Sequence, residues 1–187
     1  FVLNNFKTDF SMNPTSISLK NLLIQTPNSE IQKDAVISYP SLDAVKKNPG
    51  VLGLNIDLAQ TNINVGDIRM LMPSLKKQMA SLSPASNLYV DAVITGTVSD
   101  LTLKKVRLRG LTTTDIDVSG TIKGLPDSKK LNTDLTINKF QTSKSDLLAF
   151  IPAKSLPQSI SLPNALSVSG TVKGGMNNLY ANLTLNS

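Results

Sequence analysis

The sequence predicts a mainly β protein, built from repeated antiparallel strands with two short helices. Three observations lead to this fold class. Apolar and polar residues alternate in at least six segments, turn-forming residues separate these segments, and two further segments show helical spacing. Alternation with a period of two puts apolar side chains on one face of a strand and polar ones on the other, as is typical of antiparallel sheets. We therefore expect a sheet with one apolar and one polar face.

Each predicted strand is identified by its alternating apolar or small residues. In chain order these residues are Leu52, Leu54, Ile56 and Leu58; Val90, Ala92, Ile94, Gly96 and Val98; Ile116, Val118, Gly120 and Ile122; Leu131, Thr133, Leu135 and Ile137; Leu166, Val168, Gly170 and Val172; and Leu179, Ala181, Leu183 and Leu185. Gly, Pro and Asn clusters such as Asn48-Pro49-Gly50 and Gly174-Gly175 mark the turns between them. Polar residues such as Asn55, Asp57, Ser167, Ser169 and Thr171 are expected on the opposite, wet face.

Two segments follow a helical period instead. The first has apolar residues at Ile68, Leu71, Met72, Leu75, Met79 and Leu82, and Pro73 divides it into a short helix and a second one that begins with Pro. The second has Leu147, Phe150 and Ile151 and ends at Pro152. Asn64 and Ser143 precede an Asp by three residues in each case, so both are predicted N-caps.

The chain also contains an internal repeat. The segment 54–58 matches 131–135, the segment 67–73 matches 146–152, and Gly96-Thr-Val matches Gly170-Thr-Val. We interpret the chain as one fragment of a longer repeat protein, with units of about 51–124 and 125–187, and with 1–50 as the end of a preceding unit. It begins at Phe1 rather than Met, so we expect any anchor or signal to lie outside it.

Composition argues against an enzyme. The chain has no His and no Cys, which removes the usual general base and the commonest metal ligands. It has no nucleophile elbow and no P-loop, so we expect no catalytic residue, no cofactor and no metal site. Asp115 and Asp117 flank Ile116 and could bind calcium, but an exposed polar strand face accounts for them.

The net charge of +6 permits a nucleic-acid, lipid or acidic partner. The densest basic cluster is Lys105, Arg107 and Arg109, which share one strand face and are either solvated or in contact with lipid headgroups. Only 4% of the residues are aromatic, so the side chains that stack on bases are scarce and we expect no nucleic acid. Met70, Met72 and Met79 could form an adaptable binding lip or simply pack a helix onto the sheet.

The apolar face is the main functional signal. Six or more strands each carry three or four aliphatic side chains on it, and two short helices are too small to cover them. Either two sheets pack as a sandwich, or one sheet curls into a trough whose interior binds lipid. The residue pattern leaves both open.

Several segments together resemble the repeats of the TamB family, the translocation and assembly module, in its Bacteroidetes style and within the AsmA-like superfamily. They are "MNPTSISLKNLLIQTPNSEI" (12–31), "VGDIRMLMP" (65–73), "VITGTVSDLTLKKVRLRG" (93–110), "IDVSGTIKGLPD" (116–127), "LNTDLTINKFQTSKSDLLAFIP" (131–152) and "SLPNALSVSGTVKGGMNNLYANLTL" (161–185). The resemblance covers nearly the whole chain. It implies an elongated, taco-shaped sheet whose hydrophobic groove carries phospholipids across the periplasm toward the outer membrane.

The resemblance also implies an N-terminal anchor in the inner membrane and an Omp85-type barrel as partner. The anchor and the segment that contacts the barrel are expected to lie outside this fragment. The residues then expected to line the groove are Leu54, Ile56, Leu58, Val90, Ile94, Val98, Ile116, Val118, Ile122, Leu135, Ile137, Leu166, Val168, Val172, Leu179 and Leu183. Lys105, Arg107 and Arg109 are the expected headgroup contacts, and unpaired edge strands could self-associate. A structural β-sandwich spacer of the cell envelope and an adhesion module are the alternatives.

Overall fold

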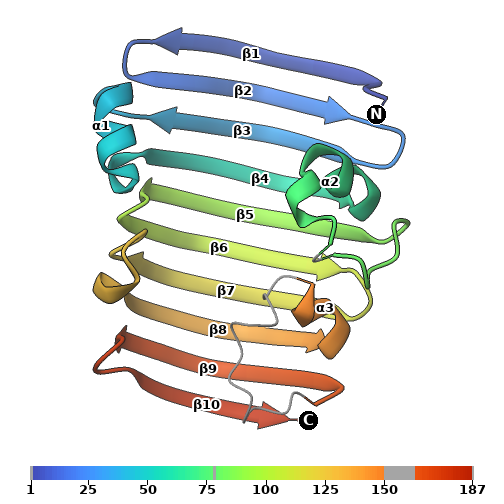
Figure 1. Ribbon diagram of the computed structural model, residues 1–187, viewed down its shortest axis with the longest axis vertical. Coiled ribbons are helices and arrows are strands. Elements are labelled where there is room, and N and C mark those ends of the chain that lie inside the picture. Colours follow the sequence, from blue (N-terminus) through green and yellow to red (C-terminus); the bar gives the residue numbers. More distant parts are fainter. Residues whose placement is uncertain (1, 78, 150–162, 187) are drawn as a thin grey trace.

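A computed structural model of the chain contains one antiparallel sheet of ten strands, in which each strand pairs only with its neighbours in the sequence (Figure 1). The structure describes residues 2–77, 79–149 and 163–186. The strands are β1 (Asn5–Asn13), β2 (Ser16–Gln25), β3 (Glu30–Ser38), β4 (Gly53–Asn64), β5 (Asn87–Thr97), β6 (Asp100–Gly110), β7 (Thr114–Lys123), β8 (Asn132–Ser143), β9 (Ala165–Gly175) and β10 (Tyr180–Asn186). The helices are α1 (Leu42–Lys47), α2 (Val65–Leu71) and α3 (Lys144–Leu148), with 3₁₀ turns η1 (Pro49–Val51), η2 (Pro73–Leu75) and η3 (Ser128–Lys130).

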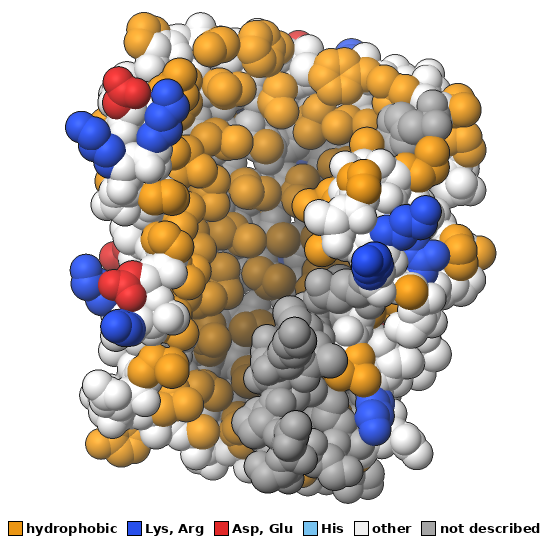
Figure 2. Space-filling view, viewed as in Figure 1, with side chains coloured by type: hydrophobic (Ala, Val, Ile, Leu, Met, Phe, Trp, Pro, Cys, Tyr) orange, Lys and Arg blue, Asp and Glu red, His pale blue; other side chains and the backbone are white. Residues whose placement is uncertain are grey.

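The mainly β, antiparallel fold class is confirmed. All described strands belong to a single open sheet, whose edges are β1 and β10, so the packing of two sheets as a sandwich is not the arrangement of this part of the chain. The sheet is hollowed on the face that carries the helices (Figure 2). Helix α1 lies at one end of the strands, and α2 and α3 lie at the other (Figure 1).

The predicted helix starts are confirmed. The Asn64 side chain accepts hydrogen bonds from the backbone N–H of Gly66 and of Asp67, and the Ser143 hydroxyl accepts one from the N–H of Asp146. Pro73 follows the end of α2 and opens η2. The second helix predicted to begin with this Pro is wrong in extent, because η2 has three residues and the described residues after it form turns. Residues 150–152 of the second predicted helix lie outside the described residues.

Helix α1 is a third helix that the periodicity did not predict. Its signals are at its ends rather than in an apolar stripe: the Ser41 hydroxyl accepts from the N–H of Ala44, Asp43 lies in the first turn, and Lys46 and Lys47 lie in the last. None of its residues is buried, which is why it leaves no apolar stripe in the sequence.

The structure repeats every four strands. Strands β1–β4 are followed by α2, and β5–β8 by α3, with Asn64 and Ser143 as N-caps 79 residues apart. The 3₁₀ turns before β4 and β8 have the same spacing. Strand pairing sets Gly96 opposite Leu54 and Gly174 opposite Thr133, so Gly174 rather than Gly170 takes the place of Gly96 in the second unit.

Candidate functional site

The inner face of the sheet carries four rows of mostly apolar side chains that cross the strands. Directly paired residues in neighbouring strands share a face, so the strand register defines each row. Row 1 is Met12, Ile17, Ile37, Leu54, Gly96, Leu101, Ile122, Thr133 and Gly174. Row 2 is Phe10, Leu19, Ala35, Ile56, Ile94, Leu103, Gly120, Leu135, Val172 and Ala181.

The other two rows lie nearer the end of the sheet that bears α2 and α3. Row 3 is Leu22, Lys33, Leu58, Ala92, Val106, Val118, Ile137, Gly170 and Leu183. Row 4 includes Thr61, Val90, Leu108, Ile116, Phe140, Val168 and Leu185, and Phe6, Ile24 and Ile31 hold the matching positions in β1–β3. Together the four rows are the surface that we call the trough.

The described residues leave much of the trough uncovered. Its central members, such as Ile56, Ile94 and Leu135, are only half-buried. Figure 2 shows the corresponding hollow lined with hydrophobic side chains between the two helix-bearing rims. At the sheet edges exposure is greater still, with 61% of Phe10 and 61% of Leu185 accessible. A continuous apolar surface of this extent is uncommon on a monomer, which makes the trough the candidate binding surface.

β-bulges keep the rows continuous. In several strands the apolar residues on the two sides of a bulge are three positions apart. Regular alternation would point these residues to opposite faces of the sheet, whereas the extra residue of the bulge brings both to the inner face. The register shifts between Leu19 and Leu22, between Leu58 and Thr61, and between Ile137 and Phe140 change the spacing from two residues to three. Asn21 and Gln60 take positive φ at two of these shifts. Because bulges also bend a strand, the same residues help to hollow the sheet.

Two glycines within the rows let neighbouring strands approach closely. Gly120 has φ +133° and Gly170 has φ +135°. A Cβ atom on Gly120 would lie 2.0 Å from the carbonyl oxygen of Asp134, and one on Gly170 would lie 2.0 Å from that of Asn182. Both are therefore positions where a side chain would collide with the backbone of the next strand.

Among the described residues, a cluster of buried apolar side chains lies at the rim of the sheet that carries α2 and α3. The cluster contains the buried side chains Val65, Met79, Leu82 and Ala149, with Ile68, Leu75 and Leu111 packed against them. The Arg69 guanidinium donates to the carbonyl oxygens of Met79 and Leu82 and so holds the segment after η2. This cluster joins the helices of the two four-strand units.

Two buried aspartates, one in α2 and one in α3, each hydrogen-bond their helix to the turn of a preceding hairpin. The Asp67 carboxylate accepts hydrogen bonds from the hydroxyls of Thr26 (2.5 Å) and Ser29 (2.6 Å) in the β2–β3 turn. Asp146, 79 residues later, makes the corresponding contact with residues 112–114, at the β6–β7 turn and the start of β7. The two side chains are thus the same structural element of the repeat.

Asp146 is fully buried and well satisfied. Its carboxylate accepts from the backbone N–H of Thr112 (3.1 Å) and Thr113 (3.0 Å) and from the Thr114 hydroxyl (2.8 Å). Burial would raise the pKa of Asp146, but these hydrogen bonds outweigh it and lower the pKa below its ordinary value. The carboxylate is therefore ionised in the folded protein at neutral pH.

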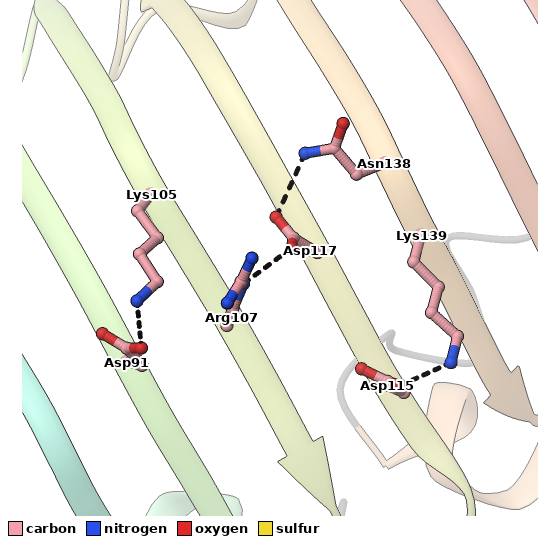
Figure 3. A network of polar contacts seen from close by, with 7 residues as sticks. All are labelled: Asp91, Lys105, Arg107, Asp115, Asp117, Asn138 and Lys139. Carbon is pink, nitrogen blue, oxygen red and sulfur yellow. Dashed lines mark hydrogen bonds and ion pairs between the residues drawn. The ribbon is translucent and has the colours of Figure 1, made fainter.

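The outer face of the sheet is polar and carries a network of charges over β5–β8 (Figure 3). Lys105 pairs with Asp91, Arg107 Nε with Asp117 (2.6 Å), and Lys139 with Asp115 (2.5 Å). Burial would raise the pKa of Asp117, but hydrogen bonds from Asn138 and Arg107 and the positive charges of Arg107 and Lys105 lower it. These groups therefore neutralise one another on the face opposite the trough.

Most of the residues expected to line a groove belong to the four rows. The register places Leu54, Ile56, Leu58, Val90, Ile94, Ile116, Val118, Ile122, Leu135, Ile137, Leu166, Val168, Val172 and Leu183 on the inner face. Val98 and Leu179 instead lie just outside the strands, after the end of β5 and before the start of β10. The expectation that these residues contact lipid stays a prediction.

The sequence reasoning missed the contribution of β1–β3 and of β6 to the trough. The residues concerned are Phe6, Phe10, Met12, Ile17, Leu19, Leu22, Ile24, Ile31, Ala35, Ile37, Leu101, Leu103, Val106 and Leu108. A spacing of three at a bulge, as in Leu19–Leu22 or Leu103–Val106, breaks the alternation that identifies a strand. Allowing one such skip would have found the residues of β2 and β6. Those of β1 and β3 keep an even spacing, but the polar residues Thr8 and Lys33 interrupt the apolar series.

The candidate headgroup contacts lie on the outer face. Lys105 and Arg107 are engaged in the ion pairs of Figure 3, whereas Arg109 lies across the strands from Tyr89 and Asp115. Arg107, Arg109 and Tyr89, but not Lys105, border a depression of about 520 Å³ together with Gln60, Thr61 and Asp91. Any contact of Arg109 with a headgroup would therefore occur across the sheet from the trough.

The Met cluster divides between the two roles considered. Met79 is buried in the rim cluster with Val65, Leu82 and Ala149, whereas Met70 and Met72 are exposed.

Within the described ranges no group of three acidic, His or Cys side chains is placed to hold a metal ion. In the same part of the chain no helix combines the length and apolarity needed to cross a bilayer.

Comparisons with protein-family models, with curated proteins and with solved structures return no match for this chain.

Proposed function

We propose that the trough shelters the acyl chains of phospholipids, as a periplasmic segment of a TamB-like bridge between the two membranes of the cell envelope. The observation that carries the proposal is the set of four apolar rows on a face that the described residues leave largely uncovered. Each methylene group moved from water to an apolar surface gains about 0.8 kcal/mol. The mechanism is passive: the protein lowers the cost of carrying a chain through water, and no catalytic residue, cofactor or metal takes part.

The chemistry of the trough favours acyl chains over peptides. The backbone groups of the inner strands are paired in the sheet, and the rows offer almost no polar side chains, with Lys33 as the main exception. A bound peptide would bury its own amide groups without partners, which is costly, whereas an acyl chain has no such groups. Transport toward the outer membrane and docking to an Omp85-type barrel are further parts of the proposal.

The trough is also long enough for such a ligand. Ten strands at about 4.8 Å spacing extend for about 43 Å along the sheet. Half of a bilayer hydrocarbon core, the depth that one lipid leaflet occupies, is about 15 Å. An extended acyl chain thus fits within the trough with room for more than one.

The direct test is photo-crosslinking. A photoreactive amino acid at Val118, in row 3, is expected to label phospholipid when the protein is incubated with lipid vesicles. The same amino acid at Ser119, the next residue on the outer face, is the matched control and should label little. Equal labelling at both positions, or none at Val118 while the protein is folded, would contradict the proposal.

A charge in the trough provides a second prediction. Ile94→Glu lies in row 2 between Ile56 and Leu103, and it should abolish the co-purification of phospholipid detected by mass spectrometry. Thr95→Glu puts the same charge on the outer face, between Asn55 and Thr102, and should leave bound lipid unchanged. In an open trough the new carboxylate reaches water, so both variants should fold. If Ile94→Glu unfolds while Thr95→Glu does not, the apolar face is a covered core and the structural spacer is favoured.

A further inference from the structure

Lys33 is the one charged residue in the four rows of the trough. It lies in row 3, where the register pairs it with Leu22 of β2 and Leu58 of β4. Lys33 is exposed, whereas Leu22 beside it is buried. The rows contain no aspartate or glutamate, so they contribute one positive charge to the trough and no negative one.

The second four-strand unit has an aliphatic side chain at the corresponding place. Strand β7 holds the position in that unit that β3 holds in the first, and its row 3 residue is Val118. The register pairs Val118 with Val106 on one side and Ile137 on the other. The same place in row 3 is therefore filled by valine in one unit and by lysine in the other, so packing of the sheet does not require the charge.

The backbone conformation at this position does not favour lysine either. Lys33 has φ +96°, a conformation that glycine adopts readily and that strains a residue with a side chain. Strained residues of this kind cluster at ligand-binding sites, where the surrounding structure holds them in place. The ammonium group is thus the feature that lysine adds here.

The ammonium group lacks a counter-charge within the described part of the chain, where the ion pairs involve other residues. The nearest carboxylates in the sequence are engaged elsewhere. Glu30 accepts a hydrogen bond from the side-chain amide of Gln25 (2.7 Å), and Asp34 accepts one from the backbone N–H of Asn21 (2.9 Å). Since water screens a charge less beside an apolar surface than in open solvent, an anionic group on a ligand would be attracted strongly here.

We propose that Lys33 binds the phosphate of a phospholipid headgroup and makes the trough selective for lipids of net negative charge, such as phosphatidylglycerol. This inference rests on the proposed function and names its preferred substrate. Phosphatidylethanolamine also carries a phosphate, but its ammonium group is repelled by Lys33 and finds no carboxylate in the rows. The apolar stem of the lysine packs against the acyl chains while the charged end reaches the phosphate.

The test is the headgroup composition of the bound lipid. The protein is incubated with vesicles that contain phosphatidylglycerol and phosphatidylethanolamine in equal amounts and with the same acyl chains. It is then separated from the vesicles, and the extracted lipid is identified by mass spectrometry. We expect phosphatidylglycerol to be enriched about two- to fivefold, the ratio that one partly exposed ion pair supplies. Lys33→Gln should return the ratio to that of the vesicles.

Lys20→Gln is the matched control. Lys20 lies opposite Asp9 on the outer face of the neighbouring strand β2, so this variant loses the same charge from the protein but none from the trough. It should keep the enrichment. Lys33→Gly provides a second uncharged variant, and because glycine suits φ +96° it is expected to fold and to lose the enrichment as well.

The outcomes separate this inference from the proposed function. Lipid bound in the ratio of the vesicles, or an enrichment that the uncharged Lys33 variants retain, would overturn the inference alone. An enrichment lost equally in Lys20→Gln would show that net charge selects the lipid, and a preference for free fatty acid would show that a carboxylate is the preferred anion. Either result would also overturn it. A wild-type protein that takes up no lipid would overturn both proposals.

Discussion

Asp146→Ala is expected to lower the free energy of unfolding by about 3 kcal/mol. The substitution leaves the N–H groups of Thr112 and Thr113 and the Thr114 hydroxyl without a hydrogen-bond acceptor in a buried site. Chemical denaturation followed by circular dichroism measures the change. Asp67→Ala, the equivalent change in the first unit, should cost less, about 1–2 kcal/mol. Its donors are the hydroxyls of Thr26 and Ser29, which can rotate to other acceptors, whereas backbone N–H groups cannot. Equal losses in the two variants would contradict this account.

The Asp146 carboxylate should also make the stability of the protein depend on pH in a defined direction. The pKa of Asp146 is lowered in the folded protein, so its contribution to stability is fully present above the unfolded value of about 3.9. That contribution is lost as the pH falls through the folded pKa. The stability difference between wild type and Asp146→Asn should therefore be constant near neutrality and shrink in acid. A difference that grows as the pH falls would show that Asp146 is not held ionised by its hydrogen bonds.

Gly120→Ala is expected to destabilise the protein by about 3 kcal/mol or more. The residue has φ +133°, which strains any side chain, and the new Cβ would lie 2.0 Å from the carbonyl oxygen of Asp134 and 2.9 Å from the Cα atom of Leu135. Both are backbone atoms of β8, so relief requires that β7 and β8 move apart. Ser119→Ala, the adjacent position on the outer face, is the control and should change stability by less than about 0.5 kcal/mol. A near-neutral Gly120→Ala would show that the strands have room at this point.

The sequence predicts this fold well where alternation is unbroken. Strands β4, β5, β7, β8, β9 and β10 show a clean period of two over at least part of their length, and two helices have caps and a Pro at the positions expected. Of the strands that escaped prediction, β2 has an apolar spacing of three at Asn21, and β1 and β3 have a polar residue, Thr8 or Lys33, within an evenly spaced apolar series. At a bulge the apolar spacing becomes three, which resembles a helix, and only strand pairing resolves the ambiguity.

The sequence predicts that one face of the sheet is apolar, but it does not predict that this face forms a trough. Alternation establishes that a face is apolar, but a covered core and an open trough need the same residues. What separates them is the number of sheets, and that depends on how β1–β10 connect. Likewise, the hydrogen bonds between Asp146 and residues 112–114 join positions more than thirty residues apart, and no local sequence pattern predicts them.

The pairing of each strand with its sequence neighbours has a consequence for how the chain folds. Most neighbouring strands are joined by short loops, the longest connections being residues 65–86 and 144–164, so the sheet can begin at any hairpin and grow outward one strand at a time. Most sheets of this size must instead wait for distant segments to meet. The hairpins bound by Asp67 and Asp146 are the best places to start, because each aspartate connects three consecutive strands, β2–β4 or β6–β8. Unfolding should run in the opposite sense, with amide exchange fastest at β1 and β10 and slowest beneath the helices.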